Sequence, residues 1–135
     1  MARPPAILFV CLGNICRSPL AEAAFRREAE RAGLAVMVDS AGTGDWHVGE
    51  PPNPRAIAVA RANGVDIAGY RGRQVTPADF ERFDVLVATH MDGERLLPSD
   101  KGPLWIVYPR DAHTELQDIR YDYRWVWQLV ELEVR

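Results

Sequence analysis

The chain alternates short apolar runs with longer stretches in which apolar and polar residues follow the helical period. The apolar runs predict buried β-strands at residues 7–10, 35–39, 84–88 and 104–108. The periodic stretches predict helices at residues 19–33, 54–63 and 77–83, and a last amphipathic helix that begins near Tyr121. Strands that alternate with helices predict an α/β fold, a three-layer sandwich with a four-stranded parallel sheet and helices on both faces.

Capping residues mark the ends of these predicted helices. Gly33 ends the first helix, because glycine readily adopts the left-handed conformation found after a helix C-terminus. Asn53 is the expected N-cap of the second helix, and Gly64 follows its end. Thr76 is expected to cap the third helix, with Asp79 at its third position in an arrangement close to a capping box.

The first predicted strand leads directly into the first helix through a short turn. The sequence over residues 7–18 is ILFVCLGNICRS. Backbone N–H groups in such a turn can surround an anion, and the helix N-terminus adds positive potential. The pattern therefore predicts a phosphate-binding loop after the first strand, between Cys11 and Arg17, formed by Leu12, Gly13, Asn14, Ile15 and Cys16.

Each side chain around this loop has a chemical role that fits phosphoryl transfer. Cys11 is the candidate nucleophile, since loop N–H groups and Arg17 favour its thiolate. The Arg17 guanidinium can hold two phosphoryl oxygens at once. Ser18 can donate its hydroxyl to the Cys11 sulfur. Gly13 permits a tight turn, and Asn14 tolerates a left-handed backbone. A lone cysteine after a strand is more often a small buried residue, but the complete motif favours catalysis.

Three segments of the chain resemble the low-molecular-weight protein tyrosine phosphatases. CLGNICRSPLAEAAF resembles the phosphate-binding loop of that family, and DSAGTGDWHVGEPPNPRAIAVARANGVDI and FERFDVLVATHMD resemble its next two blocks. The resemblance is close over residues 6–97 and looser afterwards. It implies hydrolysis of phosphotyrosine through a phosphocysteine at Cys11, without a metal or other cofactor. A tyrosine-phosphorylated protein is the implied substrate, and a tyrosine kinase is its implied counterpart.

The resemblance also implies roles for residues outside the loop. Ser40 is expected to form a hydrogen bond with Asn14, although the Gly-rich turn around it could be an ordinary loop. Trp46 is expected to line the substrate pocket, with plain loop packing as the alternative. Asp92 follows the third strand and is expected either to cap a helix or to support the phosphate-binding loop.

The general acid is the residue for which the chain departs from the family. The family sequence Asp-Pro-Tyr-Tyr-Gly is missing, and Asp111 and Asp118 are the two candidates. Asp118 is preferred because Leu116 precedes it by two residues and Tyr121 follows by three, where an aromatic residue lines the family's pocket. Ile119 stands in place of the family's proline.

Composition limits the remaining function classes. A chain of 135 residues, 47% hydrophobic, is expected to form one domain over residues 1–135. A net charge of −3 argues against nucleic-acid binding. No apolar stretch reaches the ~20 residues of a membrane helix and no export signal is visible, so a cytoplasmic location is expected. A monomer is expected as well. Two cysteines and three histidines lack metal-ligand spacing, which predicts no metal site.

Two other functions and one redox property follow from the same residues. An arsenate reductase would need further cysteines, but none follows Cys16. A catalytically weak phosphate-binding module is the second alternative, supported by the altered acid loop. An accessible Cys11 thiolate also predicts sensitivity to oxidation, in which Cys16 either forms a disulfide or only packs. Arg71 and Arg73 are expected in a solvated turn, with steering of phosphorylated substrates as the alternative.

Overall fold

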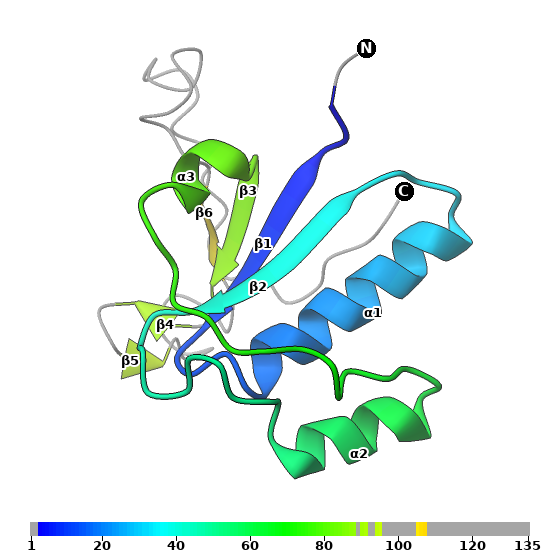
Figure 1. Ribbon diagram of the computed structural model, residues 1–135. Helices are drawn as coiled ribbons and strands as arrows, with labels where there is room; N and C mark the ends of the chain where they lie inside the picture. Colours follow the sequence, from blue (N-terminus) through cyan, green and yellow to red (C-terminus); the bar gives the residue numbers. More distant parts are fainter. Residues whose placement is uncertain (1–2, 89, 92–93, 96–104, 108–135) are drawn as a thin grey trace.

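The computed structural model describes residues 3–88, 90–91, 94–95 and 105–107. Its main sheet has the strand order β2-β1-β3-β6 (Figure 1). The strands are β1 (Ala6–Cys11), β2 (Met37–Gly42), β3 (Val85–Ala88) and β6 (Trp105–Val107). The first three are parallel to one another, with β1 at the centre. The chain therefore has an α/β fold built on a parallel sheet.

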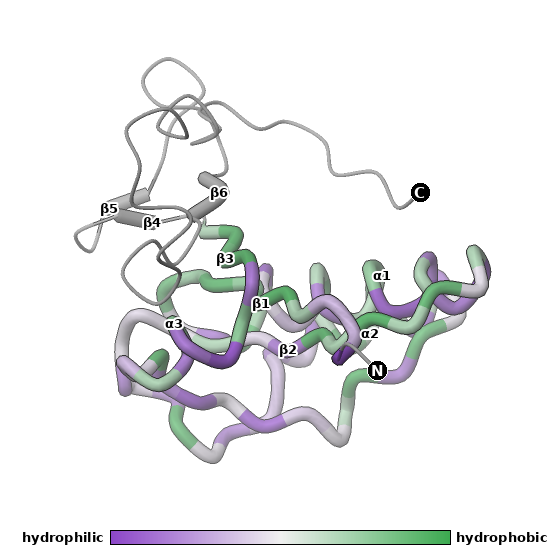
Figure 2. Tube along the Cα trace, turned by 90° about the horizontal axis from the view of Figure 1, so that it is seen from above, coloured by the Kyte–Doolittle hydropathy of each residue, from purple (hydrophilic) through white to green (hydrophobic). Residues whose placement is uncertain are grey.

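The central strand β1 is apolar because both of its faces are covered. All six of its residues are buried. Leu8 and Val10 pack on one side in a cluster with Phe83, while Ile7 and Phe9 pack on the other in a second cluster. Figure 2 shows the same concentration of hydrophobic chain where β1 and β3 lie side by side. Burial on both faces explains the continuous apolar run of this strand.

One face of the sheet is covered by helix α1, and a second helix packs on α1. Helix α1 (Arg17–Arg31) contacts β1 and β2, and helix α2 (Pro54–Ala62) lies on the outer side of α1 (Figure 1). The ring of Phe25 on α1 packs against Phe9, with ring centroids 5.7 Å apart. Small and branched apolar residues of the two helices and of the segment after α2 form one buried cluster, namely Ala23, Ala56, Ala60 and Ile67.

The predicted ends of α1 and α2 are confirmed in the structure, whereas the predicted cap of the third helix is wrong. The Asn53 side chain accepts a first-turn backbone N–H of α2 at 2.9 Å. Gly33 and Gly64 have φ angles of +69° and +79° beyond the ends of α1 and α2. The short helix α3 (Asp79–Arg82) begins at Asp79 itself, and its N-cap is Ala78 rather than Thr76. The Asp79 carboxylate accepts the backbone N–H of Thr76 at 2.8 Å. A capping box contains two hydrogen bonds, and this one corresponds to the bond that an acidic side chain accepts from a backbone N–H three residues earlier.

The sheet differs from the predicted four parallel strands at its β6 edge. Over three residue pairs β6 runs antiparallel to β3. Parallel neighbours are joined by a crossover, usually a helix. The connection from β3 instead contains the two-residue strands β4 (His90–Met91) and β5 (Glu94–Arg95), which pair antiparallel with each other. The predicted helix from Tyr121 onward lies outside the described residues. On the face opposite α1, the described cover is Phe83 with Val75.

No helix in the described part of the chain is long and apolar enough to cross a membrane. The longest, α1, has 15 residues and a polar outer surface. The fold places the end of β1 and the start of α1 at one edge of the sheet.

Replacing Leu8 with alanine should destabilise the fold strongly. The Leu8 side chain is 0% exposed at the centre of the sheet, so its truncation leaves a cavity that neighbouring side chains fill only in part. We expect a loss of about 2–5 kcal/mol in the free energy of unfolding, measured by urea denaturation. Leu34→Ala is the matched control, because Leu34 is 37% exposed. Equal losses in the two variants would contradict the position given to β1.

Candidate active site

Cys11 lies at the carboxyl end of β1 and is 2% exposed. Its sulfur accepts a hydrogen bond from the backbone N–H of Asn14 at 3.3 Å, and it lies 2.9 Å from the hydroxyl oxygen of Ser18. Both groups can donate to a thiolate, which is a far better acceptor than a neutral thiol. The two contacts therefore place two hydrogen-bond donors beside the Cys11 sulfur.

Asn14 fixes the loop through its backbone and its side chain. It is buried and has a φ of +56°, the left-handed conformation that the sequence predicts. Its amide oxygen accepts the backbone N–H of Arg73 at 2.9 Å. Its amide nitrogen donates to the hydroxyl oxygens of Ser18 at 2.8 Å and Ser40 at 3.0 Å. The predicted hydrogen bond between Asn14 and Ser40 is therefore present.

These bonds also determine the direction of the Ser18 hydroxyl. The Arg73 N–H can only be matched by the amide oxygen of Asn14, which leaves the Asn14 nitrogen facing Ser18. Because the Ser18 oxygen accepts from that nitrogen, its own proton is available to the Cys11 sulfur. Ser18 is therefore placed so that it can donate to the sulfur, the role expected from the sequence.

Carbonyl groups of the loop are held from outside by neighbouring segments. Three backbone N–H groups donate to them: Thr43 to Cys11 at 2.9 Å, Gly44 to Leu12 at 2.9 Å, and Asn53 to Ile15 at 2.7 Å. At Gly42 the approach is so close that a Cβ would lie 2.9 Å from the Leu12 carbonyl oxygen. At Gly13 a Cβ would lie 3.0 Å from the His47 ring. The end of β2 and the segment that follows β2 therefore hold the loop in place.

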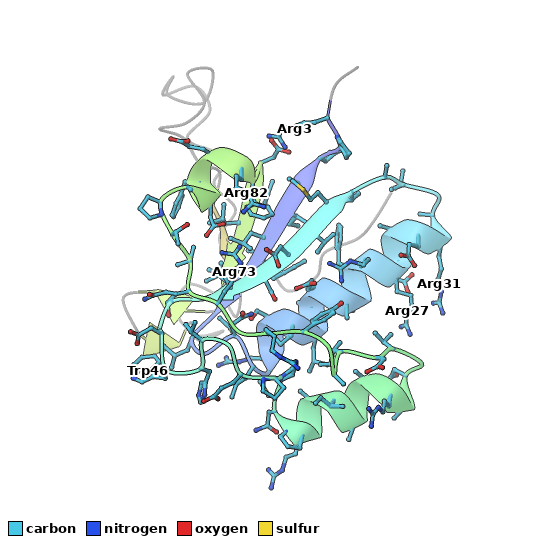
Figure 3. All side chains as sticks on the ribbon, in the orientation of Figure 1. Arg3, Arg27, Arg31, Trp46, Arg73 and Arg82 are labelled. Carbon is cyan, nitrogen blue, oxygen red and sulfur yellow. The ribbon has the colours of Figure 1, made fainter. Side chains whose placement is uncertain are left out.

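Arg73 is not in the solvated turn predicted from the sequence. Its guanidinium forms two hydrogen bonds of 3.0 Å to the carboxylate of Asp79 and one of 3.1 Å to Asp39 (Figure 3). Asp79 is 1% exposed. Burial opposes its ionisation, but the bonds from Arg73 and Thr76 outweigh burial and lower the pKa of Asp79. Asp39 lies 34 residues before Arg73 in the sequence, and a separation of six residues from Asp79 matches no local pairing rule, so no local signal indicated this cluster.

A second polar chain, also missed in the sequence, leads from Ser40 into α1. Ser40 donates its hydroxyl to one oxygen of Glu22 at 2.7 Å, and Arg26 donates to the other at 2.7 Å. Arg26 also bonds the hydroxyl of Tyr70. The side chain of Glu22 is 8% exposed. The sequence does not show that Glu22 is buried, because its partner Ser40 lies on a different element of the fold.

Some of the remaining candidate residues lie in or next to the loop, and others lie outside the described part of the chain. Arg17 is the first residue of α1 and Cys16 is its N-cap, with an exposed, free thiol. Trp46 is 66% exposed, and its ring lies against the backbone of Gly44, where a Cβ would come within 1.8 Å of the ring. His47 contacts the loop at Gly13 and pairs with Glu50 at 2.6 Å. Asp92, Asp111, Asp118 and Tyr121 lie outside the described residues.

Within the described ranges, no three His, Cys, Asp or Glu side chains come together in a group that could hold a metal ion.

The chain belongs to the low molecular weight phosphotyrosine protein phosphatase family, which it matches over residues 6–107. A phosphatase of this type from Schizosaccharomyces pombe is 48% identical over 99 residues, covering 71% of this chain and 62% of that protein. The crystal structure of YfkJ from Bacillus subtilis superposes with a TM-score of 0.65 at 43% identity, covering 67% of this chain and 58% of that one. A Drosophila arginine phosphatase has a TM-score of 0.59 at 37% identity, covering 62% and 53%.

The matched part of the chain spans about three fifths of the length of these relatives. It includes the loop, β2, α2 and α3. The family assignment confirms the resemblance seen in the sequence, and the geometry around Cys11 gives it a physical basis.

Replacing Asp79 with asparagine should lower stability at neutral pH but not in acid. Because the pKa of Asp79 is lowered in the folded state, its charge stabilises the fold above its ordinary pKa of 3.8, and that stabilisation is lost as the pH falls through the folded pKa. We expect Asp79→Asn to cost about 2–4 kcal/mol at pH 7, and the difference from the parent to shrink below pH 3.8. Urea denaturation at several pH values measures both.

The control for this variant is Glu81→Gln, which removes an exposed carboxylate from the same short helix. It should change stability little at either pH. A pH-independent loss in Asp79→Asn would show that the charge of Asp79 does not stabilise the fold.

Proposed function

We propose that this chain is a protein tyrosine phosphatase that hydrolyses phosphotyrosine through a phosphocysteine intermediate on Cys11. The observation that carries the proposal is the Cys11 sulfur at the end of β1, between the Asn14 N–H and the Ser18 hydroxyl. The start of α1 follows this loop and adds positive potential for an anion. Membership of the family supports the same reaction.

The reaction has two steps. The Cys11 thiolate attacks phosphorus, the bond to the phenolic oxygen breaks, and that oxygen takes a proton from the carboxylic acid of Asp118. The carboxylate of Asp118 then removes a proton from water, which attacks the phosphocysteine and releases inorganic phosphate. In both steps Arg17 and the loop N–H groups stabilise charge on the equatorial oxygens. Ser18 donates to the sulfur as the thiolate leaves in the second step.

The proposal includes roles for the other predicted residues. Leu12, Gly13, Asn14, Ile15 and Cys16 supply the loop backbone, and Ser40 holds Asn14 in place. Trp46 and Tyr121 form walls of the substrate pocket, and Asp92 supports the loop. The reaction needs no metal or cofactor. Two free thiols in the described structure fit a reducing compartment, which supports the cytoplasm. The substrate is a protein phosphorylated by a tyrosine kinase, and the enzyme acts as a monomer.

A second candidate substrate is phosphoarginine. The structural relative from Drosophila is described as an arginine phosphatase and shares the fold at 37% identity. The loop geometry around Cys11 serves either leaving group, because both substrates present the same phosphoryl oxygens.

One assay separates these functions. Phosphate release is measured from p-nitrophenyl phosphate and from matched peptides that carry phosphotyrosine, phosphoserine or phosphoarginine. We expect turnover of the phosphotyrosine peptide and of p-nitrophenyl phosphate, with little of the phosphoserine peptide. Faster turnover of the phosphoarginine peptide would change the substrate class. Phosphate binding without turnover of any substrate would indicate a binding module, and thiol-dependent reduction of arsenate would indicate a reductase.

Replacing Cys11 with serine should abolish turnover and preserve oxyanion binding. A serine hydroxyl is not ionised near neutral pH, whereas the loop N–H groups and Arg17 are unchanged. Turnover is measured with p-nitrophenyl phosphate, and vanadate binding by calorimetry. Cys16→Ser is the matched control, since Cys16 is exposed and its side chain makes no cap hydrogen bond. Substantial hydrolysis by Cys11→Ser would exclude Cys11 as the nucleophile.

Replacing Asp118 with asparagine should slow the reaction in a manner that depends on the leaving group. A phenolate of high pKa needs the proton, so kcat for phenyl phosphate should fall by about 10²–10⁴. The loss should be smaller with p-nitrophenyl phosphate, whose leaving group departs readily without a proton. Asp111→Asn is the comparison variant and should behave like the parent. The opposite result, a loss in Asp111→Asn alone, would make Asp111 the general acid.

A further inference from the structure

Arg73 lies outside the phosphate-binding loop, at a point where three other segments of the chain meet. Its guanidinium bonds Asp39 on β2 and Asp79 on α3. Its backbone N–H donates to the side-chain oxygen of Asn14 at 2.9 Å, and its carbonyl oxygen accepts the N–H of Gly42 at 2.8 Å. The proposed hydrolysis assigns no role to this side chain, although the N–H of the same residue supports the loop.

The strongest attachments of Arg73 are those of its side chain. The three bonds to Asp39 and Asp79 are charge-assisted, and such bonds are about twice as strong as bonds between neutral groups. The adjacent backbone is held by neutral bonds, such as that from the Gly72 N–H to the Glu50 carbonyl oxygen at 2.8 Å. The position of the Arg73 N–H therefore depends chiefly on the guanidinium of the same residue.

The Arg73 N–H determines which way the Asn14 amide faces. Only the amide oxygen can accept that N–H, so the amide nitrogen is directed at the Ser18 hydroxyl oxygen, 2.8 Å away. The Ser18 proton is then available to the Cys11 sulfur at 2.9 Å. Ser40 favours the same direction, because its own proton goes to a carboxylate. Without the Arg73 N–H, a reversed amide would present its oxygen to Ser18 and take the Ser18 proton away from the sulfur.

We propose that the Arg73 side chain is a positioning residue for the phosphate-binding loop. Its two ion pairs hold its N–H against Asn14, and Asn14 in turn keeps the Ser18 proton directed at the Cys11 sulfur. The effect on the reaction rests on the proposed function, in which Ser18 donates to the sulfur as the thiolate leaves phosphorus. Arg73 acts through Asn14 and not on the substrate, because its guanidinium is held by two carboxylates.

Rapid-mixing kinetics with p-nitrophenyl phosphate test the proposal. Formation of the phosphocysteine releases p-nitrophenol in a first phase, and hydrolysis of the phosphocysteine governs a second phase. Arg73→Ala should slow the second phase about tenfold, the equivalent of one hydrogen bond, and the first phase less. A loss of folded protein would instead lower the first-phase amplitude and the second-phase rate in proportion. A parent-like ratio of second-phase rate to first-phase amplitude would overturn the proposal.

A double-mutant cycle with Asn14→Gly tests whether Arg73 acts through Asn14. Glycine accepts the φ of +56° but removes the amide, so Arg73→Ala should cause little additional slowing in that background. Losses that multiply would overturn the proposal, because Arg73 would then act by another route. Arg82→Ala is the matched control, since it removes an exposed guanidinium from α3, the helix that carries Asp79 (Figure 3). Equal slowing in Arg82→Ala would also overturn the proposal.

Arg73→Lys keeps the test decisive if Arg73→Ala fails to fold. Arg73→Ala leaves the Asp79 carboxylate, which is 1% exposed, without its cation, and an unpaired buried charge is strongly destabilising. Arg73→Lys keeps the charge but loses the planar fork that bonds both oxygens of Asp79. It should slow the second phase by a smaller factor than Arg73→Ala. A parent-like second phase in Arg73→Lys would overturn the proposal.

Amide hydrogen exchange tests the positioning without any turnover. If the parent protein released no p-nitrophenol, the proposed function would fail, but the hold of the Arg73 side chain on its own N–H could still be measured. The backbone N–H of residue 73 should exchange about tenfold faster in Arg73→Lys than in the parent, relative to the buried N–H of Leu8 in β1. Unchanged protection of that N–H would overturn the proposal.

Discussion

The site depends above all on the left-handed backbone of Asn14 and the three hydrogen bonds of its side chain. A residue other than glycine in this conformation costs free energy, so surrounding contacts must hold it there. Arg73, Ser40 and Ser18 supply those contacts from three different parts of the chain. Glycine would adopt the backbone angle more easily but would lose all three bonds. Asparagine therefore sets both the shape of the loop and its attachment.

Because Asn14 is attached on three sides, the loop is largely preorganised around the Cys11 sulfur. The Asn14 N–H and the Ser18 hydroxyl already face the sulfur, so they need little rearrangement when a thiolate forms. Buried polar groups are costly unless they are satisfied, and here Asn14 has a partner for each amide group. Preorganised donors of this kind are an effective way to stabilise a developing anion.

The sequence was sufficient to predict features that neighbouring residues determine, such as turns and caps. It was insufficient for contacts between residues that only folding brings together. The loop after β1, the turn at Asn14 and the cap Asn53 follow from neighbouring residues, and each was predicted. The bond between Asn14 and Ser40 was also expected, but from the family resemblance. The antiparallel pairing of β6 was not, because strand direction depends on the path of the connection. The ion pairs of Arg73 were missed for a similar reason, since their partners lie on β2 and α3.

The ion pairs of Arg26 and Arg73 neutralise carboxylates that would otherwise repel an anion at the loop. Glu22, Asp39 and Asp79 lie around a loop that needs positive potential. An unpaired carboxylate about 10 Å from a phosphate dianion would oppose its binding by about 3 kcal/mol at an effective dielectric constant of about 20. Arg26 neutralises Glu22, and Arg73 bridges Asp39 and Asp79. The start of α1 and its Arg17 can then act on the anion without cancellation, while the carboxylates still anchor the hydroxyl and guanidinium groups that support the loop.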